Sequence, residues 1–408
     1  MTIFDRPSYM ATLEGYIGTP PAKVLTGIRR GGKSTLLSAL SDRLVQRGVP
    51  PERIIHLDFD EYENAPLATA DALNAHIVGH APAEGPYSVL LDEIQEVAGW
   101  EKVVNSLIAH GRADVYLTGS NSRLLSGELA TYIAGRYVAI HVAPLSFAEY
   151  LSFTQETGRY AASTRDAFSR YLRYGGFPGL FGAEYSDRQS QELLLDTYQA
   201  ILLRDVIARR QIRSPELFRR VALFALDNVG NTFSAKRVSD YLKAQGKSLT
   251  HQTVADYLDA MVDAFLLHKV TRYDLRGRAH LQTQEKYYAG DHGLIIGALG
   301  FSQSRVPGVL ENVVCNELRH RGYDVAIGKL GDAEVDFVAS RYDDKIYVQV
   351  CTTALDPTTY RRELAPLLAI KDSYPKYLLT LDTLASGNTQ GVKSMYLPDF
   401  LLAQGWSE

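Results

Sequence analysis

The sequence predicts an α/β protein that begins with a parallel sheet and continues with helical and mixed α/β parts. Short apolar runs alternate with helical stretches over residues 23–142, a pattern typical of a parallel sheet with helices on both faces. A glycine-rich segment follows the first apolar run, and an acidic pair ends the third. At 408 residues the chain is too long for a single hydrophobic core and suits about two or three domains.

The elements of the first part alternate along the chain. Strands are expected at residues 23–26, 54–59, 87–91, 114–118 and 137–142, and helices at 34–47 and 100–110. Residues 144–213 are expected to be helical, interrupted by a glycine–proline turn. Residues 215–290 are expected to form helices and then an alternating stretch, and the rest of the chain a helix, strands, a helix and a strand.

Composition and charge exclude several classes of protein. The 46% of hydrophobic and 22% of charged residues are ordinary for a globular protein. No apolar run approaches the roughly 20 residues of a membrane span, and the N-terminus lacks the pattern of a secretory signal, so we expect a cytoplasmic protein with no membrane partner. Cys315 and Cys351 are too few for a disulfide framework or metal cluster and are expected to be buried thiols. The net charge of −4 argues against a protein coated with positive charge for nucleic acid, but it permits a local basic face.

The segment GIRRGGKS at residues 27–34 matches the phosphate-binding pattern G-x-x-x-x-G-K-[ST], after an apolar strand and before a helix. Its glycines let backbone N–H groups point at phosphate oxygens, and the helix adds the positive end of its dipole. Lys33 is expected to reach the β- and γ-phosphates, and Ser34 to place its hydroxyl on Mg²⁺. The expected nucleotide-binding residues here are Gly27, Arg29, Arg30, Gly31, Gly32, Lys33, Ser34 and Thr35.

Asp92 and Glu93 end the third apolar run, in SVLLDEIQ at residues 88–95. An aspartate at this position can hold Mg²⁺, and the neighbouring glutamate can polarise the attacking water. The motif is weak alone but strong after a complete P-loop, with another strand between them. The sequence therefore predicts a Mg²⁺-dependent nucleoside triphosphatase with Glu93 as the water activator.

Polar residues also end the fourth apolar run, in LTGSNSR at residues 117–123. Thr118, Ser120 and Asn121 could each contact the γ-phosphate or the attacking water from the adjacent strand tip. The alternative is an ordinary polar turn. Ser120 or Asn121 is the expected sensor residue.

These residues, taken with later motifs, resemble a family of prokaryotic AAA+-like ATPases with an extra C-terminal domain. The resemblance rests on TGIRRGGKSTLL, LLDEIQ, LTGSNSRLLSGELATYIAGRY, APLSFAEYL, RYGGFPGL and KYYAGDHGL, in that order. It implies ATP, Mg²⁺ and self-assembly into a ring such as a hexamer. The implied domains are a P-loop ATPase core at 1–145, a helical lid at 146–213, a winged helix-turn-helix at 214–290 and a degenerate PD-(D/E)XK-nuclease-like domain at 291–408.

In such ATPases an arginine from a neighbouring subunit often stabilises charge on the transferring phosphate. Arg123 and Arg136 are the candidates, with Arg136 preferred, and a surface ion pair is the alternative for each. The turn at residues 175–179 looks like the glycine–proline element near the adenine in related ATPases. This would pack Pro178 on the base, whereas a plain helix-breaking turn is equally compatible.

Residues 214–290 fit a helix-turn-helix with a two-stranded wing. Ser234 is expected to cap one helix and Thr250 the next, whose first turn would face the bases of double-stranded DNA. The cations expected to contact phosphates from the wing are Arg272, Arg276, Arg278 and Lys286. The second helix also carries three aspartates, which suit a phosphate-lined groove poorly, so a protein-packing role stays open.

A PD-(D/E)XK site needs an acidic residue on a helix, an aspartate on a strand, and Glu-x-Lys on the next strand. Glu311 and Asp336 supply the first two, but Gln349 replaces the carboxylate and Cys351 the lysine. An amide binds a metal weakly and a thiol supplies no cation, so no nuclease activity is expected.

Two functions remain open. One is an ATPase whose cycle drives self-assembly or remodelling, including on DNA. The other is a slow nucleotide-controlled switch or scaffold that binds protein partners, which the pI of about 6.2 and the degenerate nuclease motif favour.

Overall fold

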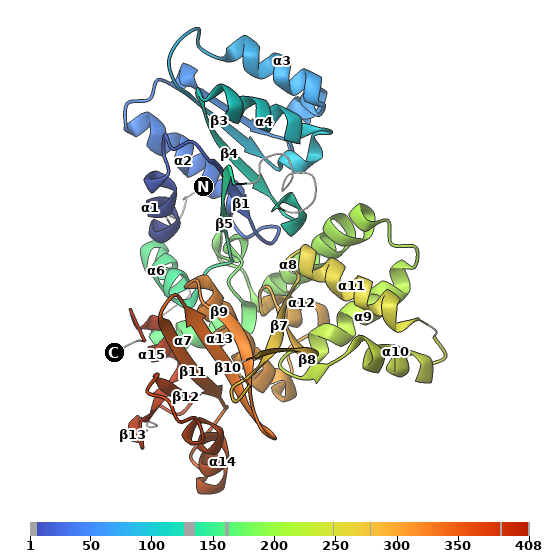
Figure 1. The fold of residues 1–408 in the computed structure, drawn as a ribbon, viewed down its shortest axis with the longest axis vertical. Helices are drawn as coiled ribbons and strands as arrows, with labels where there is room; N and C mark the ends of the chain where they lie inside the picture. Colours follow the sequence, from blue (N-terminus) through green and yellow to red (C-terminus); the bar gives the residue numbers. More distant parts are fainter. Residues whose placement is uncertain are drawn as a thin grey trace. The chain divides into compact units, whose positions relative to one another are not determined.

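The computed structural model describes residues 6–125, 135–159, 163–247, 249–277, 279–383 and 386–406. The chain divides into two compact units, Met1–Ala143 with Asp263–Phe265, and Pro144–Val262 with Leu266–Glu408. Each unit contains its own sheet (Figure 1). The expected end of the ATPase core at residue 145 lies next to this division.

The sheet of the first unit is entirely parallel and has the strand order β2-β3-β4-β1-β5. The strands are β1 (Ala22–Thr26), β2 (Ile54–Asp58), β3 (Tyr87–Asp92), β4 (Ala113–Gly119) and β5 (Tyr137–His141). The expected strands are thus present, with small shifts at their ends. Because β4 lies between β1 and β3, its end is adjacent to both the P-loop and the acidic pair.

Helices cover both faces of this sheet (Figure 1). They are α1 (Pro7–Gly15), α2 (Lys33–Gln46), α3 (Ala70–His80) and α4 (Trp100–His110), with 3₁₀ turns at Pro51–Arg53, Tyr62–Leu67, Ile94–Glu96 and Ser122–Leu125. Neighbouring strand residues point to opposite faces. Leu25 accordingly packs in the cluster with α1 and α2, and Val24 in the cluster with α3 and α4. Burial on both faces explains why these strands are continuous apolar runs.

The second unit begins with helices. They are α6 (Phe147–Thr157), α7 (Thr164–Tyr174), α8 (Asp187–Ala200) with a π-helical continuation at Ile201–Ala208, α9 (Pro215–Asp227), α10 (Ala235–Ala244) and α11 (His251–Asp263). Side-chain caps start several of them, including the two that the sequence predicts. The hydroxyl of Ser234 accepts from the N–H of Arg237 at 3.3 Å, and that of Thr250 accepts from the N–H of Thr253 at 3.1 Å.

A mixed sheet follows, in the order β13-β14-β12-β11-β10-β9-β7-β8-β6. Its strands are β6 (Thr232–Phe233), β7 (Leu267–Asp274), β8 (Ala279–Ala289), β9 (Asp324–Leu330), β10 (Ala333–Arg341), β11 (Asp344–Val350), β12 (Lys376–Thr380), β13 (Gly387–Thr389) and β14 (Val392–Tyr396). The remaining helices are α12 (Gly293–Leu299), α13 (Val306–His320), α14 (Pro357–Leu368) and α15 (Leu397–Leu402), with 3₁₀ turns at Pro178–Phe181 and Gln303–Arg305.

The sheet crosses the domain boundary expected at residues 290 and 291. Strand β7 pairs in parallel with β9 through Arg272, Tyr273 and Asp274 (Figure 1). The hairpin expected to be the two-stranded wing is therefore part of the same sheet as the C-terminal strands. The sequence pattern does not predict the pairing of β7 with β9, because strand pairing depends on residues far apart in the sequence.

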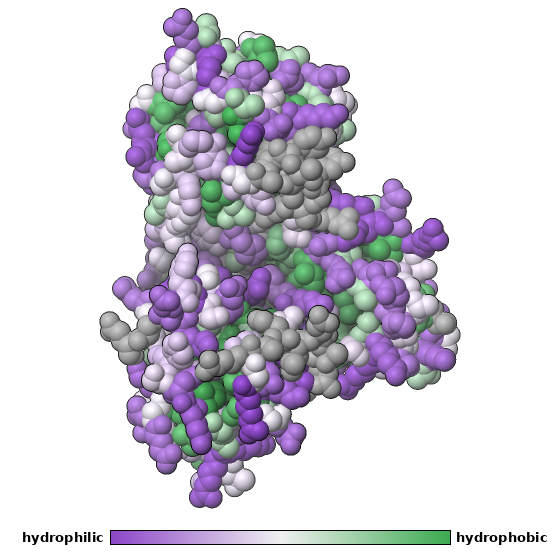
Figure 2. Space-filling view, viewed as in Figure 1, coloured by the Kyte–Doolittle hydropathy of each residue, from purple (hydrophilic) through white to green (hydrophobic). Residues whose placement is uncertain are grey.

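On the face drawn in Figure 2, hydrophilic side chains are spread over both units and apolar ones form small patches. Within the described ranges, no helix has the length and apolar character that crossing a bilayer requires.

Candidate nucleotide-binding site

The P-loop joins the end of β1 to the start of α2, as the sequence predicts. Gly27 has φ 149°, and a Cβ at this position would lie 2.1 Å from the carbonyl oxygen of Val142. Gly32, directly before α2, has φ 100°. Any other residue at position 27 would clash with the backbone of the neighbouring segment, so glycine is required by close approach.

Lys33 lies inside this loop with 3% of its surface exposed. Its Nζ donates to the carbonyl oxygens of Gly27 at 3.0 Å and Ile28 at 3.1 Å, and lies 3.9 Å from Oε1 of Glu93. The ammonium is therefore held by the loop itself, directly opposite the acidic pair.

Asp92 ends β3 and is 2% exposed. The hydroxyl of Thr118, at the end of β4, donates to its Oδ1, and Ser34 also hydrogen bonds to its side chain. Burial raises the pKa of Asp92, and the hydrogen bonds from Thr118 and Ser34 work in the opposite direction. The two expected Mg²⁺ ligands, Ser34 and Asp92, are thus brought together.

Glu93 adopts a left-handed backbone conformation, with φ 49°, which is strained for a residue with a side chain. Two hydrogen bonds hold it, because its N–H donates to Oδ1 of Asp92 at 3.1 Å and to Oγ1 of Thr118 at 2.9 Å. This turn aims the carboxylate away from the strand, at the P-loop lysine. Such a strained and well-held residue is a common feature of functional sites.

Gln95 is a neighbour that the sequence reasoning missed. Its Nε2 donates to Oε2 of Glu93. Its Oε1 occupies the space beside Gly119, where a Cβ would lie 2.6 Å from it. The signal in the sequence is the position of Gln95, two residues after Glu93 in the motif DEIQ.

Thr118, near the end of β4, and Ser120 and Asn121, directly after it, are all buried. Thr118 contacts both acidic residues, although Ser120 or Asn121 was the preferred sensor. Ser120 is 0% exposed and Asn121 is 4% exposed. The sensor role of Asn121 stays a prediction.

Arg6, before α1, supports the P-loop from behind and also escaped the sequence reasoning. Its Nη1 donates to the carbonyl oxygens of Ala143 at 2.8 Å and Gly31 at 3.3 Å. Its guanidinium lies 4.3 Å from the ring centroid of Tyr9, whose hydroxyl accepts from the N–H of Ala143. Arg6 is 3% exposed, so it acts as an internal brace that ties the loop to the end of β5.

The other expected arginines have different surroundings. Arg29 forms an ion pair with Asp60 at 2.8 Å, while Arg30 and Arg136 are exposed. Thr35 is exposed on the first turn of α2. The side chain of Arg123 lies outside the described residues.

Pro178, the residue expected to pack on adenine, is half-buried and begins the 3₁₀ turn Pro178–Phe181 in the second unit. The glycines before it are tied to a later motif, because the carboxylate of Asp291 accepts from the N–H of Gly176 at 2.8 Å. A Cβ at Gly175 would lie 1.9 Å from Oδ1 of Asp291. Two of the motifs behind the family resemblance therefore meet in one contact.

The wing carries fewer available cations than the sequence predicts. Lys286 is 3% exposed, and Arg272 lies 3.8 Å from a carboxylate oxygen of Glu334. Arg276 is exposed, and Arg278 lies outside the described residues. The expectation that Lys286 meets phosphates is wrong, because its ammonium is enclosed by carboxylates.

Those carboxylates include the expected remnant of a nuclease site. Nζ of Lys286 lies 3.2 Å from Glu311, 2.9 Å from Glu334 and 3.7 Å from Asp336. The hydroxyl of Tyr288 donates to Glu311 at 2.8 Å. Burial works to lower the pKa of Lys286, but the surrounding carboxylates outweigh it and raise that pKa, so the lysine stays charged.

Gln349 and Cys351, at and just after the end of β11, are occupied in other ways. Gln349 accepts from the N–H of Asp336 at 3.2 Å and donates to Glu363 at 3.0 Å. Burial, followed by the nearby Glu363, raises the pKa of Cys351 to about 12, so its thiol is protonated at neutral pH. Neither residue supplies a metal ligand or a cation to the carboxylates.

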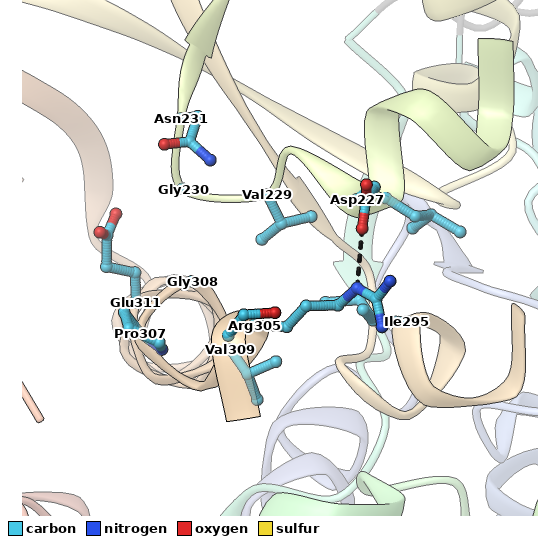
Figure 3. Close-up of a pocket in the computed structure, with 12 residues that line it drawn as sticks. Asp227, Val229, Gly230, Asn231, Ile295, Arg305, Pro307, Gly308, Val309 and Glu311 are labelled. Atoms are coloured by element: carbon cyan, nitrogen blue, oxygen red, sulfur yellow. Dashed lines mark hydrogen bonds and ion pairs between the residues drawn. The ribbon is translucent and has the colours of Figure 1, made fainter. Parts of the chain in front are cut away.

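Among the described residues, no group of three or more His, Cys, Asp or Glu side chains is placed to hold a metal ion. A pocket of about 330 Å³ opens beside Glu311, and Figure 3 shows the residues that line it. Arg305 crosses it to pair with Asp227 at 2.7 Å. The charged groups labelled in this pocket therefore have partners within the protein.

Comparison with known proteins gives matches over most of the chain. Residues 19–151 match a family model described as an AAA domain, and residues 165–305 match a model described as a domain of unknown function (DUF8612). An uncharacterized protein of Haemophilus influenzae is 36% identical over 401 residues, which are 98% of this chain and 99% of that protein. An uncharacterized protein of Methanocaldococcus jannaschii is 29% identical, with 86% of this chain and 79% of that protein covered.

Among solved structures, the Walker-type ATPase of Pyrococcus abyssi is similar with a TM-score of 0.50 at 16% identity, covering 72% of this chain and 96% of that chain. At this identity the likeness concerns the fold alone. That fold is the P-loop type, in agreement with the parallel sheet of the first unit.

Proposed function

This chain belongs to the same family as the Haemophilus influenzae relative and carries an AAA domain, and from this premise we propose that it binds and hydrolyses ATP with Mg²⁺. One observation carries the proposal. Lys33 of the P-loop lies buried beside Asp92 and Glu93 of the acidic motif, with its Nζ 3.9 Å from Oε1 of Glu93. The side chains of Ser34 and Thr118 both hydrogen bond to Asp92.

The protein groups fit Mg²⁺ and a triphosphate. The close approach of Gly27 to Val142 leaves no room for a side chain at position 27, and the side chain of Ser34 hydrogen bonds to the carboxylate of Asp92. When bound, Mg²⁺ supplies positive charge that stabilises the phosphate oxygens. Ser34 and Asp92 would hold it.

Each protein group then has one task. Backbone N–H groups of the loop bind the phosphates, and the positive charge of Lys33 stabilises the phosphate oxygens. Glu93 orients the attacking water and accepts its proton. Thr118 fixes the backbone of Glu93, and Gln95 fixes its carboxylate.

The test is the substitution Glu93→Gln in the full chain. It removes the base but keeps the size of the side chain, so we expect ATP binding to persist and turnover to fall by about 10²–10⁴-fold. Glu96→Gln, at an exposed position on the same turn, is the matched control and should keep the parent rate. Full turnover in Glu93→Gln would remove Glu93 from this role, and a chain that binds no nucleotide with Mg²⁺ would end the proposal.

We also propose that the ATPase assembles into a ring in which Arg136 of one subunit completes the site of the next. Arg136 is exposed at the edge of the sheet, next to β5. Arg136→Ala and Glu93→Gln should each be inactive, yet a mixture should recover activity because one subunit supplies the arginine and another the glutamate. Without recovery, Arg136 has no role in trans, and Arg123 becomes the candidate for the same experiment.

For the second unit we propose a winged helix-turn-helix joined to a nuclease-like domain without nuclease activity. The neutral Gln349 and the enclosed Lys286 support this proposal. Purified protein should leave plasmid DNA intact in Mg²⁺. Cutting that disappears in Asp336→Asn would contradict it.

A slow switch that binds a protein partner is the second candidate function. The pairing of Arg272 and Lys286 with carboxylates favours it, because the wing then has fewer cations for duplex DNA. Retention of duplex DNA that weakens steeply with salt would favour remodelling on DNA instead, since contacts with phosphates release counterions.

A further inference from the structure

A pocket of about 630 Å³ lies in the second unit, beside the ends of β7 and β9, the start of β11 and the segment after α14. Its volume falls in the range of roughly 300–1,000 Å³ that is typical of small-ligand sites. Tyrosines and cationic side chains dominate its polar lining. We call it the tyrosine–lysine pocket, and define it by Tyr273, Arg276, Lys345, Tyr347, Lys371 and Tyr374.

The cations of this pocket have few acidic neighbours. Backbone hydrogen bonds are the main cause that lowers the pKa of the carboxyl of Asp274, two positions before Arg276, and the positive charge of Arg276 contributes to lowering it. Within the ranges that the structure describes, none of Arg276, Lys345 and Lys371 forms a salt bridge with a carboxylate. This differs from the pocket of Figure 3, where Arg305 pairs with Asp227. The tyrosine–lysine pocket therefore carries positive charge that a bound anion would neutralise.

Among the described residues, one acidic residue, Asp372, also lines the pocket. Other groups of the protein already bind its carboxylate. Oδ2 of Asp372 accepts from the hydroxyl of Tyr347 at 2.5 Å, and Oδ1 lies 3.4 Å from Nζ of Lys376. The N–H of Tyr374 also donates to Oδ1. Asp372 thus orders the pocket wall without cancelling the three cations.

Aromatic rings stand beside the positive charge. Nζ of Lys345 lies 5.2 Å from the ring centroid of Tyr374 and 6.0 Å from that of Tyr273. Tyr374 keeps 40% of its surface exposed, so part of its side chain faces solvent. Rings that can stack on a base, next to cations that can contact a phosphate, are the two elements with which proteins hold single nucleotides of a strand.

We propose that the tyrosine–lysine pocket binds a nucleotide unit, with the base stacked on Tyr374 and the phosphate contacted by Arg276 and Lys371. The unit belongs either to a single-stranded nucleic acid or to a free mononucleotide. This proposal does not depend on hydrolysis at the P-loop, whose residues lie in the other unit.

The test uses the full chain, fluorescein-labelled oligothymidylate and a saturating non-hydrolysable ATP analogue that fills the P-loop. Fluorescence anisotropy at low salt should show binding. The double variant Arg276→Glu, Lys371→Glu should weaken it at least about tenfold, because two phosphate-binding charges are reversed. Lys102→Glu, an exposed lysine on α4, is the control for charge and should change the affinity less than about twofold.

A second pair of variants tests stacking and guards against misfolding. Tyr374→Phe keeps the ring and should bind like the parent, whereas Tyr374→Ala should bind about fivefold or more weakly. Competition by dTMP, which lacks the β- and γ-phosphates that a P-loop binds, would identify a free nucleotide as the ligand. Binding of the strand without competition by dTMP would identify single-stranded nucleic acid.

Three results would overturn the proposal. The first is the absence of binding to both oligothymidylate and dTMP. The second is an equal loss of affinity in the double variant and in Lys102→Glu. The third is an unchanged affinity in Tyr374→Ala together with duplex DNA that competes as well as the single strand.

Discussion

The backbone N–H of Gly176 donates to Oδ2 of Asp291 at 2.8 Å, joining two motifs that are 115 positions apart in the sequence. Oδ1 of the same carboxylate accepts from the N–H of Gly293 at 2.7 Å. Asp291 is 2% exposed, and the space at Gly175 is filled by this carboxylate. These hydrogen bonds connect the turn after α7 to the segment between β8 and α12. The helices at the start of the second unit are therefore linked to its sheet through one buried carboxylate.

Asp291→Ala should destabilise the second unit by about 2–6 kcal/mol, because it leaves two buried N–H donors without an acceptor, each costing about 1–3 kcal/mol. Asp291→Asn keeps one acceptor oxygen and should cost less. The measurement is chemical unfolding of each variant. Asp227→Ala is the control. It removes the exposed ion pair with Arg305 and should lower the stability by less than about 1 kcal/mol. An equal loss of stability in both alanine variants would show that the hydrogen bonds of Asp291 contribute no more than this ion pair.

Gln95→Ala should lower kcat for ATP about tenfold with little change in KM, because Gln95 touches the carboxylate of Glu93 and not the phosphate-binding loop. Steady-state kinetics tests this.

The variant Gln95→Glu gives a second readout. It replaces the amide that donates to Glu93 by a carboxylate that repels it, so kcat should fall at least as far as in Gln95→Ala. A kcat equal to that of the parent in both variants would show that Gln95 does not act through Glu93.

Lys286→Met should destabilise the protein by about 3–5 kcal/mol, because it leaves the largely buried carboxylates of Glu311 and Asp336, and the partly exposed one of Glu334, without their cation. Lys269→Met is the matched control. It removes an ion pair with Glu285 in the adjacent strand that is partly exposed, and it should cost less than about 1 kcal/mol. Similar unfolding curves for the two variants would mean that the buried ammonium contributes no more than a surface one.

Arg6→Met should weaken ATP binding about tenfold, because the carbonyl oxygens of Gly31 and Ala143 lose the guanidinium that braces the loop. Calorimetric titration measures the affinity. The control is Arg43→Met, which removes a partly exposed ion pair with Glu14 on the neighbouring helix. An unchanged affinity for Arg6→Met would show that the loop holds its shape without this brace.

The sequence by itself determined the parallel sheet of the first unit, the P-loop, the acidic pair and the caps at Ser234 and Thr250. These follow from local rules, since apolar spacing defines strands and helices, and a glycine pattern defines a phosphate-binding turn. Each signal lies within a few neighbouring residues.

Only the tertiary structure decided which distant groups meet. Thr118 reaches Asp92, Arg6 reaches the P-loop, and Lys286 enters the carboxylate cluster, because strand order and helix packing bring them together. A lone cation in the sequence looks the same whether it will face phosphate or be enclosed by acids. The strand pairing that places β8 in the C-terminal sheet makes that choice, and this pairing depends on contacts between residues far apart in the chain.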